Sequence, residues 1–328
     1  MSGICAMWRK NVPRLSGVAI AQMAEGLSVC APEEVRVELD ACAGLGVSAR
    51  FGTEQIYRNS RLIVACDADL CREDELREAA VGVPDAPAAQ KTAALVASLY
   101  ERFGSEFVER LRGGFSVILW DCRQRTLLAA VDGFGIKRLA YYEDSEKTLV
   151  ATRIGALTRT GEVETVVNPR AIVNVLNFTT SLGPDTVLAK VSRLLPGTML
   201  TVSAATTRTR PYWDMRCGQG PQQSEKDLAR QLDAVVEQSV AAHCKSDPPA
   251  AVGAFLSGGT DSSTIVGMMH RLGRDPVHAY SIGFQEQSFN ELEYAAITAK
   301  KFNATHHTHL VGPNDCLEAL PHMVRTFD

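Results

Sequence analysis

Apolar runs broken by short polar turns fill the first two thirds of the chain and predict mostly strands. Residues 115–120 are apolar, 121–125 are polar, and 126–131 are apolar again, which predicts a β-hairpin. Further strands are expected within residues 61–70, 148–153 and 197–203. Many strands with few helices are typical of an α+β layered domain.

One helical segment precedes the hairpin. Apolar residues recur there at spacings of four, as on one face of a helix: Leu95, Leu99, Phe103, Phe107 and Leu111. Gly104 falls inside the segment and predicts a weak point in the helix. The apolar face is expected to pack against a sheet.

The last third of the chain instead alternates strands with helices. Strands are expected at 251–256, 277–284 and 306–311, and helices at 224–243, 264–272, 290–302 and after Pro313. Such alternation predicts a parallel, doubly wound sheet whose ligands bind at the carboxyl ends of the strands. Because the Gly- and Gln-rich segment 217–227 separates the two regions, we expect domains at 1–215 and 216–328.

A glycine turn with the sequence SGGTDSS, Ser257 to Ser263, joins the first strand of the second domain to a helix. Gly258 and Gly259 lack a Cβ, so the chain can come close to a ligand there. The first N–H groups of the helix have no intrahelical partner and favour an anion. The Walker, dinucleotide and nucleophile-elbow patterns are absent, so we expect another kind of phosphate loop, with a plain turn capped by Asp261 or Ser262 as the alternative.

Composition and charge limit the classes of partner that the protein can bind. The chain has 328 residues with 45% hydrophobic content, enough for two packed domains. With 34 basic and 38 acidic residues the net charge is −4, which disfavours nucleic acid. The nine cysteines form no C-x-x-C pair, which is typical of reduced thiols, and no apolar run approaches the length of a membrane span. We expect a cytoplasmic protein with no nucleic-acid or membrane partner.

The sequence SGGTDSS resembles the pyrophosphate loop of ATP pyrophosphatases. The whole chain resembles the glutamine-dependent asparagine synthetases through MSGICA, LRGGFSVILWD, DGFGIKRLAYY, RLLPGTMLTV and YWD in the first domain and YSIGF, FNELEYA and VRTFD in the second. The resemblance implies an α+β N-terminal-nucleophile (αββα) domain, followed by the first part of an α/β doubly wound pyrophosphate-loop domain.

In that family ATP adenylates the side-chain carboxylate of aspartate, and ammonia from glutamine then displaces AMP. The resemblance therefore implies ATP and Mg²⁺ as cofactors, and aspartate or a similar carboxylate with ammonia or an amine as small-molecule substrates, with a homodimer as an assembly to test. On the matching positions the phosphates would be held by Ser257, Gly258, Gly259, Asp261, Ser262 and Ser263. Asp261 would also bind Mg²⁺ through a hard oxygen ligand. Leu256 and Ile282 would contact the nucleotide, with strand core as the alternative interpretation.

The first domain departs from the family at its catalytic positions. Ser2 stands where the family has a cysteine nucleophile, and a serine hydroxyl attacks more weakly because of its higher pKa. The family's Asn-Gly-Glu segment aligns with Cys66–Ala68, its Arg-Gly-Pro-Asp motif has no counterpart within residues 48–55, and no carboxylate lies within 90–92. We expect this half to be an inactive glutaminase. Cys5 lies inside the chain without the α-amine and is expected to pack in the core.

Two other features have a plain interpretation. His306 to His309 read HHTH, but on a strand His307 and His309 share one face while His306 points away, so a metal site is not expected. Glu291 and Glu293 open a helix, where capping is favoured over a substrate role.

The family's synthetase domain continues past the final VRTFD into a second motif that holds substrate, Mg²⁺ and a catalytic lysine. We therefore expect the chain to be a fragment or a truncated product, and residues 1–328 to bind ATP weakly and complete no ligation. The leading hypothesis is an asparagine-synthetase-like amide ligase. The alternatives are a β-lactam-synthetase-like or peptide-cyclising ligase and an incomplete family member that acts by binding.

Overall fold

The computed structural model describes residues 2–12, 14–28, 34–80, 82–218, 220, 223–244 and 252–327. The chain divides into two compact units, one formed by residues up to Arg216 and the other by Cys217–Phe327. The expected start of a strand at residue 251 lies outside the described residues. No helix in the described ranges is both long enough and apolar enough to cross a membrane.

The first unit contains two antiparallel six-stranded sheets. In strand order, one is β10-β8-β9-β1-β3-β2 and the other is β12-β11-β7-β6-β5-β4. The first sheet is built from β1 (Gly3–Arg9), β2 (Glu34–Leu39), β3 (Ala43–Ala49), β8 (Ala140–Glu143), β9 (Lys147–Ala151) and β10 (Val191–Arg193). The second is built from β4 (Glu54–Arg58), β5 (Leu62–Leu70), β6 (Gly113–Asp121), β7 (Thr126–Val131), β11 (Thr198–Val202) and β12 (Thr207–Pro211).

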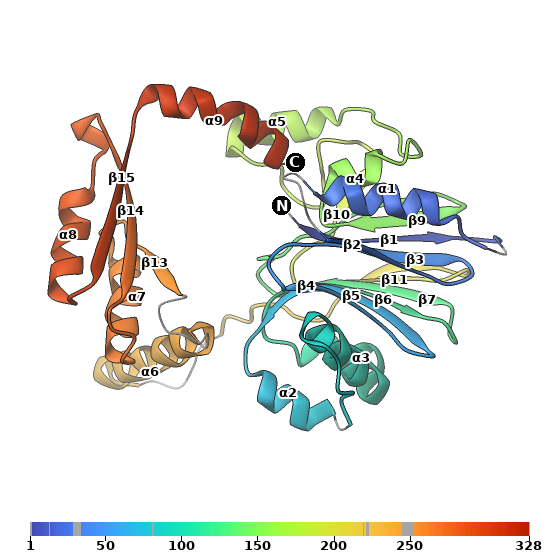
Figure 1. The fold of residues 1–328 in the computed structure, drawn as a ribbon, viewed down its shortest axis with the longest axis horizontal. Coiled ribbons are helices and arrows are strands. Elements are labelled where there is room, and N and C mark those ends of the chain that lie inside the picture. The colour runs from blue at the N-terminus through green and yellow to red at the C-terminus, as the bar shows by residue number, and fades with distance from the viewer. Residues whose placement is uncertain are drawn as a thin grey trace. The chain divides into compact units, whose positions relative to one another are not determined.

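Helices cover the outer faces of both sheets, giving four layers (Figure 1). The first sheet is covered by α1 (Gly17–Leu27) and α4 (Ile154–Thr158), and the second by α2 (Glu73–Ala80) and α3 (Lys91–Phe103), with 3₁₀ turns at Ala88–Gln90 and Gly104–Glu109. A further helix, α5 (Pro169–Phe178), leaves most of its apolar side chains exposed. Alternate residues of β1 show why both faces are apolar: Ile4 and Ala6 pack between the sheets, whereas Cys5 and Met7 pack under α1 and α4. The αββα fold is confirmed.

The strands and the helix expected in this unit are present, and the structure shows where the helix ends. Strands β6 and β7 make the predicted hairpin, with Asp121 opposite Thr126. The predicted weak point ends α3, because Gly104 is its C-cap in the left-handed region at φ 56° and a 3₁₀ turn follows. Leu95, Leu99 and Phe107 are buried against the second sheet, so the predicted packing role is confirmed.

The second unit is a parallel sheet in the order β13-β14-β15, with strands alternating with helices as predicted. Its elements are α6 (Glu225–His243), β13 (Gly253–Phe255), α7 (Thr260–Arg271), β14 (His278–Phe284), a 3₁₀ turn (Gln287–Phe289), α8 (Leu292–Lys301), β15 (Thr305–Val311) and α9 (Pro313–Thr326). One face packs Ala254 and Ala279 into a core with Val266 of α7 and Ala295 of α8.

The other face of this sheet carries exposed apolar side chains. Phe255 is 83% exposed and Ile282 is 61% exposed, and Tyr280 lies between them on the same face. Parallel sheets are normally covered on both faces. Within the described part of this unit, one face is covered and the other is open.

Candidate functional site

The glycine turn lies at the carboxyl end of β13, and Gly259 is the N-cap of α7. Asp261 falls in the first helical turn, so the predicted helix begins a few residues earlier than its apolar pattern suggested. Ser257, Gly259 and Asp261 are exposed. The strand, the turn and the helix N-terminus therefore present N–H groups and a carboxylate at one accessible place.

Gly258 is required by its surroundings. Its φ is +87°, in the left-handed region, and a Cβ placed on it would lie 2.6 Å from Cβ of Tyr294 and 2.7 Å from N of Ala295. The first turns of α8 thus press directly on the loop. Glycine is the residue that allows both the backbone angle and this close approach.

The loop hydroxyls form a closed ring of hydrogen bonds. The N–H of Gly259 donates to Oγ of Ser257 at 3.4 Å, and Oγ of Ser262 donates to the carbonyl of Gly259 at 3.2 Å. The two hydroxyl oxygens are 3.0 Å apart, so Ser257 is the donor between them, because Ser262 has already used its only hydrogen. The N–H of Ser257 also donates to Oγ of Ser262 at 3.2 Å. The loop is held in shape by its own residues.

The remaining predicted residues lie around this ring with different exposure. Ser263 is turned toward α8, with its Oγ 2.9 Å from Oγ1 of Thr298. Leu256 is 2% exposed and belongs to the core of the unit, whereas Ile282 is largely exposed on the open face of the sheet. Of the two residues expected at the nucleotide, Ile282 is the one whose side chain is accessible.

Helix α8 begins at Leu292 and receives its side-chain cap from Asn290. The side-chain oxygen of Asn290 accepts the N–H of Leu292 at 3.1 Å, while Glu291 occupies the N-cap position without a side-chain cap bond. Glu293 lies in the first turn, where its charge favours the helix dipole as expected. Both glutamates therefore open the helix as expected, while the side-chain hydrogen bond to its first N–H group comes from Asn290.

The histidines of β15 point to opposite faces, as predicted. His307 lies on the open face, with its Nε2 3.0 Å from Nδ1 of His278 and its ring 4.6 Å from that of Tyr280. His306 points the other way, toward Ser281. Among the described residues, no three His, Cys, Asp or Glu side chains are grouped so that they could hold a metal ion.

In the first unit, Ser2 is tied to a carboxylate. Its hydroxyl donates to Oε1 of Glu54, a residue that is 3% exposed. The other oxygen of Glu54 accepts the N–H groups of Phe51 at 3.0 Å and Arg50 at 3.3 Å. Burial alone would raise the pKa of Glu54, but these hydrogen bonds outweigh burial and hold the pKa below its ordinary value of 4.5.

A second carboxylate lies across the strand pair, where β5 places Asp67 opposite Glu54. Asp67 is buried and its Oδ1 is 2.7 Å from Nζ of Lys137. Burial raises the pKa of Asp67, and the negative charge of Glu54 adds to this, while Lys137 opposes it. Ser2 is therefore bonded to Glu54, Glu54 is paired across the strands with Asp67, and Asp67 is paired with Lys137. Of these residues, Asp67 belongs to the segment Cys66–Ala68.

The loop that carries Lys137 is fixed by a buried aspartate. Asp132 is 1% exposed, and its carboxylate accepts the N–H groups of Phe115 (3.2 Å), Phe134 (3.0 Å), Ile136 (3.1 Å) and Lys137 (2.9 Å). Because three of these bonds go to the backbone of the loop and the fourth goes to Phe115 of β6, the position of Lys137 is set by the fold. Sequence reasoning missed both Glu54 and Lys137, which carried no recognisable spacing.

Residues 90–92, where the sequence has no carboxylate, lie at the start of α3 and are held by Gln55. Oε1 of Gln55 accepts the N–H groups of Thr92 at 2.8 Å and Ala93 at 3.3 Å, and its Nε2 donates to the carbonyl of Gly52 at 2.9 Å. A neutral amide therefore satisfies the start of α3. Cys5 is fully buried and burial raises the pKa of its thiol, which confirms its packing role.

Comparison with known proteins assigns both units. Residues 56–213, which lie in the αββα unit, match the family described as glutamine amidotransferase domain. Residues 231–328 match the family described as asparagine synthase. The chain belongs to the asparagine synthetase (glutamine-hydrolysing) family.

Three relatives show how far the similarity extends. A candidate glutamine-hydrolysing asparagine synthetase of Mycobacterium bovis is 33% identical over 238 residues, which is 70% of this chain and 36% of the relative. Asparagine synthetase 1 of Bacillus subtilis is 30% identical over 237 residues, with the same coverage. Amidase chyE of Penicillium rubens is 33% identical over 186 residues, which is 55% of this chain and 26% of that protein. The chain thus spans about a third of the length of the asparagine synthetases it matches.

Proposed function

We propose that this chain binds the phosphates of ATP at Ser257–Ser263 and takes part in ATP-dependent amide formation as an asparagine-synthetase-like ligase. The loop carries the proposal: its hydroxyls are already ordered, its glycines leave room for phosphate oxygens, and the N-terminus of α7 favours an anion. In such a reaction the carboxylate of aspartate or a similar acid attacks the α-phosphorus of ATP and releases pyrophosphate. Ammonia or an amine then displaces AMP from the acyl carbon.

The residues present fit magnesium and a triphosphate. Asp261 offers an exposed carboxylate in the first turn of α7, a hard oxygen ligand of the kind that Mg²⁺ prefers. A magnesium ion there would neutralise charge on the departing pyrophosphate. The N–H groups of Ser257 and Gly259, which donate to hydroxyls of the loop, would exchange those bonds for phosphate oxygens. Ile282 offers an accessible apolar contact for the nucleotide.

We propose further that the nitrogen reaches the site as ammonia or as an amine, and not from glutamine hydrolysed at Ser2. The support is the environment of that hydroxyl, which is bonded to the Glu54 carboxylate with Asp67 close by. Glutamine hydrolysis develops negative charge on an oxygen that must be stabilised by hydrogen-bond donors. Two neighbouring carboxylates oppose that charge, and the cation Lys137 is paired with one of them, Asp67.

A second candidate rests on the same observation. If the first unit supplies no ammonia, the attacking amine can belong to the substrate itself, as in a β-lactam-synthetase-like or peptide-cyclising ligase. The two are separated by the product, which is a free primary amide in the first case and an internal amide in the second. A member that acts by binding alone would form neither.

The test is carboxylate-dependent exchange of labelled pyrophosphate into ATP. We expect none from residues 1–328, because this chain spans about a third of its relatives, and we expect exchange from a longer form that includes the rest of the synthetase domain. Asp261→Ala should abolish exchange in that form. Asp275→Ala should leave exchange unchanged, because Asp275 lies beyond the C-terminal end of α7, where it contacts His270. Absence of exchange in the longer form would contradict the proposed function. Robust exchange by residues 1–328 would contradict the expectation that the ATP site also needs residues from the rest of the synthetase domain.

A further inference from the structure

The phosphate loop leaves the sheet at Leu256, the residue after β13. The N–H of Leu256 still pairs with the sheet, donating to the carbonyl of Tyr280 at 2.8 Å. Its side chain lies in the core at 2% exposure. Leu256 is thus the last residue anchored to the sheet before the loop begins at Ser257.

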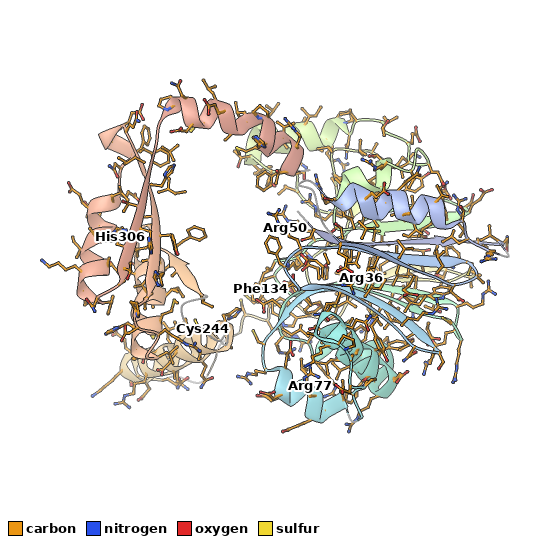
Figure 2. The ribbon with its side chains drawn as sticks, viewed as in Figure 1. Arg36, Arg50, Arg77, Phe134, Cys244 and His306 are labelled. Atoms are coloured by element: carbon orange, nitrogen blue, oxygen red, sulfur yellow. The ribbon has the colours of Figure 1, made fainter. Side chains whose placement is uncertain are left out.

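A buried side chain holds the carbonyl of Leu256. Oγ of Ser281, on β14, donates to this carbonyl at 2.5 Å, and Ser281 is 5% exposed. The same Oγ is 2.7 Å from Nε2 of His306, which stands on β15 and is labelled in Figure 2. Two side chains therefore connect all three strands to the residue before the loop.

The direction of each hydrogen bond is determined by its partner. A carbonyl can only accept, so the single hydrogen of the Ser281 hydroxyl goes to Leu256. Nε2 of His306 must then be the donor to Oγ of Ser281, which places a hydrogen on Nε2 in either the neutral or the charged ring. The Ser281 hydroxyl is buried and His306 is half-buried, so removing His306 leaves the Ser281 oxygen without its donor, and removing the hydroxyl leaves the Leu256 carbonyl without its donor.

We propose that Ser281 and His306 are positioning residues for the phosphate loop, an inference that rests on the proposed phosphate-binding function. The carbonyl of Leu256 and the N–H of Ser257 belong to one planar peptide unit, so fixing the oxygen fixes the direction of the N–H. That N–H donates to Oγ of Ser262 at 3.2 Å, inside the ring of loop hydrogen bonds. The serine and histidine thus orient the first N–H of the loop that is proposed to bind phosphate.

The open face of the same strand supplies a matched control. His307 is the next residue along β15, but it contacts His278 and Tyr280 and not Ser281. A change at His307 therefore alters the same strand without touching the Leu256 carbonyl. Conservative changes supply the second control: Ser281→Thr keeps the hydroxyl, and His306→Gln keeps an N–H donor near the place of Nε2.

The experiment measures amide hydrogen exchange of the loop peptide in the whole chain, with and without magnesium pyrophosphate. We expect Ser281→Ala and His306→Leu to raise exchange of the loop without ligand about threefold or more, with exchange across α7 and α8 unchanged. In the same variants, pyrophosphate affinity should fall about tenfold, which corresponds to about 1.4 kcal/mol. Ser281→Thr, His306→Gln and His307→Leu should behave as wild type.

Two results would overturn the inference. In one, loop exchange in Ser281→Ala equals that of wild type. In the other, Ser281→Thr and His306→Gln raise loop exchange and weaken pyrophosphate binding as much as Ser281→Ala and His306→Leu do. That result would mean that side-chain packing, and not the hydrogen bonds, positions the loop. If wild type shows no protection by pyrophosphate, the proposed function fails, but the ligand-free comparison of the variants still decides the positioning role.

Discussion

Ser2 and Ser257 occupy the two candidate sites, and their surroundings are opposites. Ser2 is half-buried and its hydroxyl is bound to Glu54, a carboxylate that two backbone N–H groups hold in place. Ser257 is exposed and bonds only within its own loop. A hydroxyl paired with a buried charge stabilises the fold, whereas a hydroxyl satisfied by weak local bonds can exchange them for a ligand.

The same contrast holds for the units that carry them. Strands β1 and β5 of the first unit are buried on both faces along most of their length. The sheet of the second unit leaves one apolar face exposed within its described residues. Substitutions beside Ser2 should therefore change stability, and substitutions in the loop should change ligand binding, which the following experiments can refute.

The largest effect is expected from Gly258→Ala. Alanine would have to adopt the left-handed backbone of Gly258, and its Cβ would collide with Tyr294 and Ala295. The second unit should therefore lose about 3 kcal/mol of stability, measured by hydrogen exchange of α7 and β14. Gly273→Ala is the matched control, because Gly273 also has a positive φ of 73° but no atom within 4 Å of its Cβ position. It should cost about 1 kcal/mol. Equal costs at both positions would show that α8 does not press on the loop.

Glu54→Ala should come next and act on the first unit alone. It leaves the hydroxyl of Ser2 and the N–H groups of Arg50 and Phe51 without their acceptor, at a cost of about 2–3 kcal/mol. All three tryptophans lie in this unit, so their fluorescence during urea unfolding reports on it. The exposed Glu38, 3.4 Å from Arg58, is the control, and Glu38→Ala should cost less than about 1 kcal/mol.

Acid should reduce the contribution of Glu54. Because its folded pKa lies below its ordinary value of 4.5, the carboxylate stabilises the fold above that pH, and the contribution is lost as the pH falls through the folded pKa. The raised pKa of Asp67 acts in the opposite sense, since its contribution is present in acid and is lost as the pH rises. The stability difference between wild type and Glu54→Gln should therefore shrink from about pH 7 to about pH 3. A constant difference would contradict the paired-carboxylate account.

The smallest effect is expected from Ser2→Cys. A cysteine restores the family's nucleophile but leaves Glu54 and Asp67 beside it, so glutamate release from glutamine should stay at background in both proteins, with the N-terminus confirmed as residue 2. Turnover by Ser2→Cys would show an intact pocket and a wrong alignment of Cys66–Ala68.

Periodicity and turn chemistry predict much of the fold from the sequence. The hairpin at 115–131 and the alternation past residue 224 follow from local patterns, and both form. The loop stood out because glycines, an acid and serines are adjacent in sequence. Glu54, Asp67 and Lys137 could not be found in this way, because strand pairing and a loop held by Asp132 bring them together from distant positions. The Ser281–His306 pair likewise depends on the register of three strands.

The central claim is that the loop of the second unit binds pyrophosphate with the help of Asp261. Isothermal titration of magnesium pyrophosphate into wild type, Asp261→Ala and Asp275→Ala tests it most directly. The account predicts weak but saturable binding to wild type, binding to Asp261→Ala that is weaker by about tenfold or more, and unchanged binding to Asp275→Ala. Equal affinity in all three proteins, or no binding to wild type, would contradict it.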